Sequence, residues 1–98
     1  MELVISDKIK AKLQAKHGVS PKDVVECFWN RIGEVFEDVR EEHRTDPPTL
    51  FFISENNHGR VLKVCYVERD GRIHLKTCFE PSASQLEAYR QLCGDAAP

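Results

Sequence analysis

Three side chains suited to phosphate chemistry follow one another at alternate positions, namely Arg72, His74 and Lys76, and Lys63 lies in the β-rich run before them. Cleavage of RNA by its own 2′-hydroxyl requires a base for that hydroxyl, an acid for the leaving oxygen and positive charge at the phosphate, and it requires no metal. An imidazole titrates near neutral pH and can serve as acid or base. The pattern therefore predicts His74, Lys76 and Lys63 as catalytic residues of a site without metal or cofactor.

The same residues have a purely structural interpretation. Antiparallel sheets commonly keep one face in water, and lysine, arginine and a lone histidine are ordinary there. The pattern alone leaves both interpretations open.

These residues would be positioned by a hairpin centred on Asp70-Gly71, a dipeptide that tolerates the positive φ angles of a two-residue type I′ loop. If Arg69 faces Arg72, directly opposed residues share a face. The face predicted to join the core holds Leu62, Val64, Tyr66, Ile73, Leu75, Thr77 and Phe79. The face predicted to stay open holds Val61, Lys63, Cys65, Val67, Arg69, Arg72, His74, Lys76, Cys78 and Glu80.

Capping and turn residues predict the remaining elements. They are a strand over Glu2–Ile5, a helix from the N-cap Ser6 to His17, a helix from the N-cap Ser20 to about Asn30 that buries Trp29, a weak strand over Glu34–Val39, a strand over Thr49–Glu55 and a helix from Ser82 to Gly94.

The element order β-α-α-β-β-β-β-α predicts an α+β fold over residues 1–98, as a single domain. We expect an antiparallel sheet of four to five strands, with two N-terminal helices and one C-terminal helix on its apolar side and the opposite face open.

Composition indicates a soluble globular protein of 98 residues, with 41% hydrophobic and 31% charged residues. The apolar run Leu3–Ile5 is too short for a signal peptide or membrane span, which predicts a cytoplasmic protein without membrane association. The four cysteines form no Cys-x-x-Cys pair, so they are expected to be free thiols rather than zinc ligands.

Charge is unevenly distributed along the chain. The net charge of −2 disfavours nonspecific nucleic-acid binding, yet basic residues gather in the first helix and the hairpin, while residues 26–46 are acidic. A basic face on an acidic protein and an unevenly charged solvated surface are both compatible with this. On the first interpretation the residues expected to bind RNA phosphates are Arg60, Arg69, Arg72, Lys12 and Lys16.

Three stretches together resemble the BrnT family, the toxin half of a bacterial type II toxin–antitoxin pair related to RelE-type ribonucleases. They are Lys16-His17-Gly18-Val19-Ser20 between the first helices, Gly59-Arg60-x-Leu62-x-Val64 followed by Tyr66, Glu68 and Arg69, and the spacing from Ile73 to Tyr89. The resemblance implies a RelE-like fold, RNA as substrate and an antitoxin-like protein partner.

The chain diverges from the family pattern at two places. It has Thr77-Cys78-Phe79 where the family strand ends in Ser-Ala-Arg, and Gln85 where the next helix carries a glutamate. Either Lys76 and His74 would then have to compensate, or the activity is lost. Similar sequences have been labelled hydrolases of ADP-ribosyl-dinitrogen reductase, but no carboxylate cluster for a dimetal site is visible here.

Two functional hypotheses follow: a toxin-like, metal-independent endoribonuclease, or a non-catalytic module that binds a protein through the acidic segment Glu34–Asp46. The RNA target and the oligomeric state are not specified by the sequence.

Overall fold

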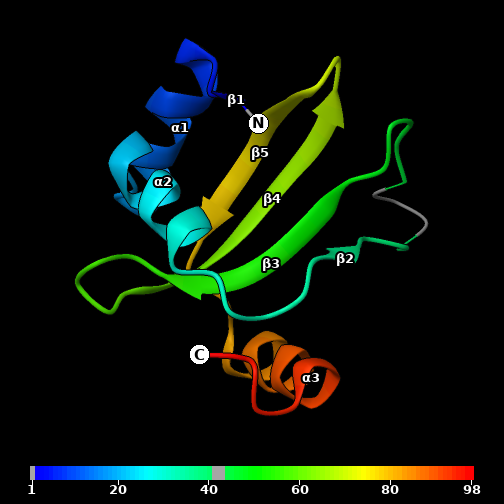
Figure 1. Ribbon diagram of the computed structural model, residues 1–98. Coiled ribbons are helices and arrows are strands. Elements are labelled where there is room, and N and C mark those ends of the chain that lie inside the picture. Colours follow the sequence, from blue (N-terminus) through cyan, green and yellow to red (C-terminus); the bar gives the residue numbers. More distant parts are fainter. Residues whose placement is uncertain (1, 41–43) are drawn as a thin grey trace.

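A computed structural model describes residues 2–40 and 44–98, which form a five-stranded sheet of order β1-β5-β4-β3-β2 with three helices (Figure 1). The strands are β1 (Glu2–Val4), β2 (Phe36–Glu37), β3 (Leu50–Glu55), β4 (Val61–Arg69) and β5 (Arg72–Phe79). The helices are α1 (Asp7–His17), α2 (Pro21–Trp29) and α3 (Ala83–Cys93). The predicted α+β class and element order are confirmed.

The sheet is mixed, and the prediction of a purely antiparallel sheet is wrong at one edge. β1 pairs with β5 in parallel, whereas β2, β3, β4 and β5 pair antiparallel. β1 and β2 lie at opposite edges, so α1 and α2 carry the chain from one edge to the other along one side of the sheet. β1 and β5 are far apart in the sequence, so no tight turn joins them and they can run parallel.

Each helix begins at its predicted N-cap. The Ser6 side chain accepts the Ile9 N–H at 3.2 Å, and Ser20 and Ser82 each form a capping box with the residue three positions later. These caps satisfy backbone donors that would otherwise lack a partner.

The main core lies between α1, α2 and one face of the sheet, where Phe28 packs edge-on against Phe52 at 4.9 Å and Tyr66 at 5.4 Å between ring centroids. Trp29 was predicted to be buried, but it is 77% exposed. The buried apolar positions of α2 are Val24 and Cys27, with Phe28 beside them. One further residue turns the helix by about 100°, which carries Trp29 off that face.

The β4–β5 hairpin forms around Asp70-Gly71, whose φ angles are 55° and 72°. The predicted register holds from Arg69 opposite Arg72 to Tyr66 opposite Leu75, after which Cys65 pairs with Thr77. Lys76 is thus the extra residue of a β-bulge.

The bulge reverses the predicted faces of the residues that follow it. Cys78 lies opposite Val64 and is fully buried in the core, whereas Thr77 and Phe79 join Cys65 and Lys63 on the other face. A one-residue slip has this effect because side chains alternate along a strand.

The face opposite the core is partly covered, although it was predicted to stay open. Tyr89 of α3 is 2% exposed, and its ring lies 5.7 Å from that of Phe36 and 6.5 Å from that of Phe51. Its hydroxyl donates to the Glu34 carbonyl at 2.6 Å, and burial raises the pKa of Tyr89 to about 12. Burial of the aromatic residues of β2 and β3 is favourable, and α3, which lies apart from α1 and α2, packs over them (Figure 1).

The weak strand predicted over Glu34–Val39 is reduced to the two residues of β2. In the acidic segment, Glu41, Glu42 and His43 lie outside the described residues. Within the described ranges, no helix is long and apolar enough to cross a membrane.

Candidate active site

The face of the sheet opposite the core carries a cationic hollow with a volume of about 260 Å³. It is lined by Asp38, Arg40, Thr49, Lys63, Cys65, Lys76, Thr77, Phe79 and Gln85. Two of the predicted catalytic residues, Lys63 and Lys76, therefore meet here from neighbouring strands. Phe79 and Gln85, the positions of divergence from the family pattern, line the same hollow, and Phe79 reaches it because of the bulge.

Lys63 is only 8% exposed, and its Nζ lies 4.5 Å from the ring centroid of Phe51 and 6.0 Å from that of Phe79. An ammonium over aromatic faces is stabilised by their quadrupoles. Within residues 2–40 and 44–98, none of the ion pairs includes Lys63. The aromatic rings therefore stabilise the Lys63 ammonium, and it forms no ion pair with a carboxylate in the described part of the chain. A cation in this environment is suited to bind an anion.

Lys76 is held by a short series of hydroxyl groups. Its Nζ donates to Thr49 Oγ1 at 3.0 Å, and Thr49 Oγ1 lies 3.1 Å from Thr45 Oγ1. Thr45 donates its proton to the Pro47 carbonyl at 2.8 Å. Thr49 must then donate to Thr45 and accept from Lys76, so the series has one direction and fixes the position of the ammonium.

Arg40 is a cation of the hollow that the sequence did not single out. Its Nε and a terminal nitrogen donate to the Asp38 carboxylate at 3.1 and 3.0 Å. Arg40 follows a run of acidic residues, and no local pattern distinguishes it. The pairing of β2 with β3 brings it to the site.

His74 lies in an adjoining hollow of about 230 Å³, which it shares with Lys76 and Arg69. Residues two apart on a strand are separated by about 7 Å, so His74 and Lys76 are neighbours. Lys63 is four residues from Val67, the partner of His74, or about 13 Å along β4. The structure thus brings Lys76 together with each of the other two, but it places Lys63 and His74 in separate hollows.

The residues predicted to bind RNA are dispersed. Arg69 lies beside His74, and Arg72 forms an exposed ion pair with Glu2 at 3.0 Å at the hairpin end. Lys12 and Lys16 are exposed on α1, which packs on the core side of the sheet, away from the cationic hollow.

Arg60, the remaining predicted RNA ligand, is engaged within the fold. Its guanidinium donates to the carbonyls of His17 and Gly18 at 2.6 and 2.8 Å and to Glu80 at 2.7 Å. The last carbonyls of a helix lack intrahelical donors, so Arg60 completes the C-terminus of α1.

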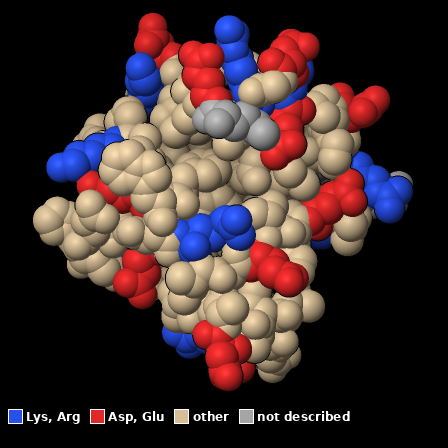
Figure 2. All heavy atoms as spheres, in the orientation of Figure 1, with Lys and Arg blue, Asp and Glu red and all other residues tan. Residues whose placement is uncertain are grey.

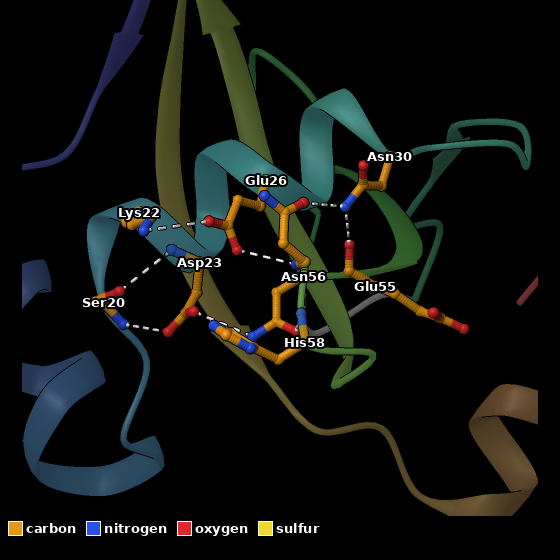
Figure 3. Close-up of polar contacts among 9 residues, drawn as sticks. Ser20, Lys22, Asp23, Glu26, Asn30, Glu55, Asn56 and His58 are labelled. Carbon is orange, nitrogen blue, oxygen red and sulfur yellow. Dashed lines mark hydrogen bonds and ion pairs between the residues drawn. The ribbon is translucent and has the colours of Figure 1, made fainter.

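The turn before β4 is fixed by side chains of α2 (Figure 3). Asn56 accepts the His58 and Arg60 N–H groups at 3.0 and 2.9 Å and donates to Asp23 at 3.1 Å. Glu26, which is 2% exposed, accepts the Asn57 N–H at 2.9 Å. Hydrogen bonds lower the pKa of Asp23, although burial opposes them. This network sets where β4, and with it Lys63, begins.

Cys65 is the only thiol lining the cationic hollow in the described part of the chain. Burial raises its pKa, although Lys63 acts in the opposite direction. The thiol therefore stays protonated near neutral pH, when it is a poor nucleophile.

Comparison with solved structures identifies the architecture. The fold is that of the Brucella abortus ribonuclease toxin BrnT, with a TM-score of 0.62 over 84% of this chain and 97% of that chain, at 18% sequence identity. The chain therefore has a BrnT-like, toxin-like fold, as the sequence resemblance implied.

Sequence comparison adds less. No protein-family model matches the chain. A sesquiterpene synthase of Toona sinensis is 29% identical over 73 residues, which are 72% of this chain, and the chain spans 13% of that protein's length. A likeness to so small a part of an enzyme carries no activity to this chain.

Proposed function

We propose that the protein is a toxin-like endoribonuclease that cleaves RNA without a metal ion, with His74, Lys76 and Lys63 at its active site. The observation that supports this most is the position of Lys76, which adjoins Lys63 in one hollow and His74 in the next. A general acid–base group beside clustered cations is what RNA transphosphorylation requires.

In the proposed step the ribose 2′-oxygen attacks the adjacent phosphorus, and the proton of the 2′-hydroxyl passes to a general base of the protein. The bond from phosphorus to the 5′-oxygen breaks, and that oxygen takes a proton, which leaves a 2′,3′-cyclic phosphate and a 5′-hydroxyl. Lys76 stabilises the charge on the phosphate, and His74 transfers a proton on one side of it. Lys63 is about 13 Å from His74, so it holds a neighbouring part of the RNA.

The likeness to a ribonuclease toxin also supports an antitoxin-like protein partner, which we propose covers the cationic hollow in the cytoplasm. A non-catalytic, protein-binding role remains the second candidate. It is favoured by the exposure of Glu34, Glu37 and Val39 around the two-residue edge strand β2.

Incubation of the purified chain with RNA in EDTA tests the proposal. The wild type should cleave, and His74→Ala and Lys76→Ala should each lose about a hundred-fold or more in rate. Lys8→Gln, which removes an exposed charge on α1 outside both hollows, is the matched control and should cleave normally. Cleavage that survives both site substitutions would remove this active site, and an inactive wild type would favour the protein-binding role.

A further inference from the structure

A second hollow, of about 380 Å³, lies between α3 and the sheet beside the cationic one. Its walls are mainly apolar and include three aromatic residues, Phe36, Phe51 and Tyr89. Val39 and Leu92, each 63% exposed, also line it. Its volume lies within the range of small-molecule sites, about 300–1,000 Å³.

The two hollows adjoin each other and share four lining residues. Both are lined by Asp38, Arg40, Lys63 and Gln85, and the Lys63 ammonium lies 4.5 Å from the ring centroid of Phe51. An anionic group at Lys63 and Lys76 would therefore lie at the entrance of an aromatic hollow. The best ligand for this arrangement carries an anion and a flat ring joined by a short linker.

We propose that the apolar hollow binds the base of the nucleotide whose phosphate lies between Lys63 and Lys76, an inference that rests on the proposed function for its RNA substrate. Proteins recognise single-stranded RNA by packing unstacked bases against aromatic side chains and hydrogen-bonding their edges. The Gln85 side-chain oxygen accepts the Ser82 N–H at 2.9 Å, and its amide nitrogen can donate, so the junction offers a polar partner to a base edge or a ribose hydroxyl. An apolar protein segment would match the apolar walls of the hollow but would offer no anion to the cations at the junction.

Binding of adenosine 5′-monophosphate and ribose 5-phosphate to the full chain tests the base site, because the two ligands share the sugar and phosphate and ribose 5-phosphate has a hydroxyl in place of the base. Adenosine monophosphate should bind at least about ten-fold more tightly, a difference of about 1.4 kcal/mol. Amide signals of Phe36 and Phe51 should shift only with the nucleotide.

A variant that fills the apolar hollow separates the contribution of the base to affinity from that of the phosphate. Ala88 lines the hollow from an exposed position on α3, so Ala88→Leu should fold and narrow the site. It should weaken adenosine monophosphate about ten-fold and leave ribose 5-phosphate within two-fold. Gln91→Leu, at an exposed α3 position outside the hollow, is the matched control and should change neither affinity.

Equal affinities for the two ligands, or an Ala88→Leu variant that binds the nucleotide normally, would overturn the base site; a groove that serves a protein segment would give this result. RNA cleavage is scored separately, so active enzyme without base discrimination removes only the base site. Base discrimination by an inactive protein would instead remove the endoribonuclease and retain the nucleotide site.

Discussion

Arg60 and Lys63 are three residues apart, and the structure gives their charges different environments. The Arg60 guanidinium donates to two main-chain carbonyls and one carboxylate, which uses its planar set of donors within the fold. The Lys63 ammonium lies among aromatic rings at the edge of a hollow. Of the two cations, Lys63 is therefore the one available to a ligand.

Arg60→Met should lower the free energy of unfolding by about 1.5–3 kcal/mol, because hydrogen bonds from a charged group to the end of α1 are lost. Arg69→Met, which removes an exposed arginine near the hairpin turn, should stay within about 0.5 kcal/mol of the wild type. Urea denaturation monitored by circular dichroism measures both. Unchanged stability of Arg60→Met together with weaker RNA binding would mean that Arg60 is a phosphate ligand, as its sequence context suggested.

At the scale of elements, local signals in the sequence predicted local structure correctly. Asp70-Gly71 specified the hairpin turn, and serine caps specified all three helix starts. The bulge at Lys76 was missed because Lys76 and Thr77 are both polar and are compatible with either register. The parallel pairing of β1 was missed because the residues of a strand do not indicate which other strand it will pair with.

The candidate site was predictable only where it lies on the hairpin. The alternation of β4 and β5 predicted Lys63, His74 and Lys76 on one face; in the structure Lys63 and Lys76 line one hollow, and His74 and Lys76 line the next. Arg40 and the aromatic hollow depend on contacts among β2, β3 and α3, which are distant in sequence. α3 packs over apolar residues that would otherwise be exposed on two strands, β2 and β3. No single segment of the sequence shows that these residues need a helix to bury them.

The bulge itself can be tested through the cysteines, because it exchanges a core position for a surface one. A regular hairpin would place Cys65 and Cys78 on the same accessible face, whereas the bulge buries Cys78 completely and leaves Cys65 partly exposed. Burial also raises the pKa of Cys78, which keeps its thiol unreactive. Under native conditions Cys78 should react with a maleimide roughly a thousand-fold more slowly than Cys65.

Peptide mapping by mass spectrometry gives the two labelling rates in one sample. Cys27, which is fully buried in α2 and whose pKa burial raises to about 12, is the internal control and should be protected like Cys78. Equal labelling of Cys65 and Cys78 would indicate that the hairpin has a regular register without the bulge, with Phe79 in the core.

At the scale of the whole molecule, charge is mixed rather than segregated. The net charge is −2, and the face in Figure 2 shows lysine and arginine interspersed with aspartate and glutamate, with uncharged surface between them. The lysines of α1 lie on the other side of the sheet from the cationic hollow. Under the proposed function a long-range field would therefore contribute little to attracting RNA, and the affinity would come from the few cations at the site.

The salt dependence of RNA binding measures how many cations take part. For single strands the slope of log K against log salt is about −0.7 per phosphate contact, so contacts from Lys63 and Lys76 alone give about −1.4. Phosphate contacts from all seven basic residues that the sequence predicted at the site would give a slope of about −5. These residues are Lys63, Lys76, Arg60, Arg69, Arg72, Lys12 and Lys16. Filter binding of a 2′-O-methyl RNA oligomer, which cannot be cleaved by its own 2′-hydroxyl, provides the measurement. Lys76→Gln should reduce the slope by about 0.7 and Lys8→Gln should leave it unchanged, whereas a wild-type slope near −5 would show that the surface binds RNA as a broad basic face.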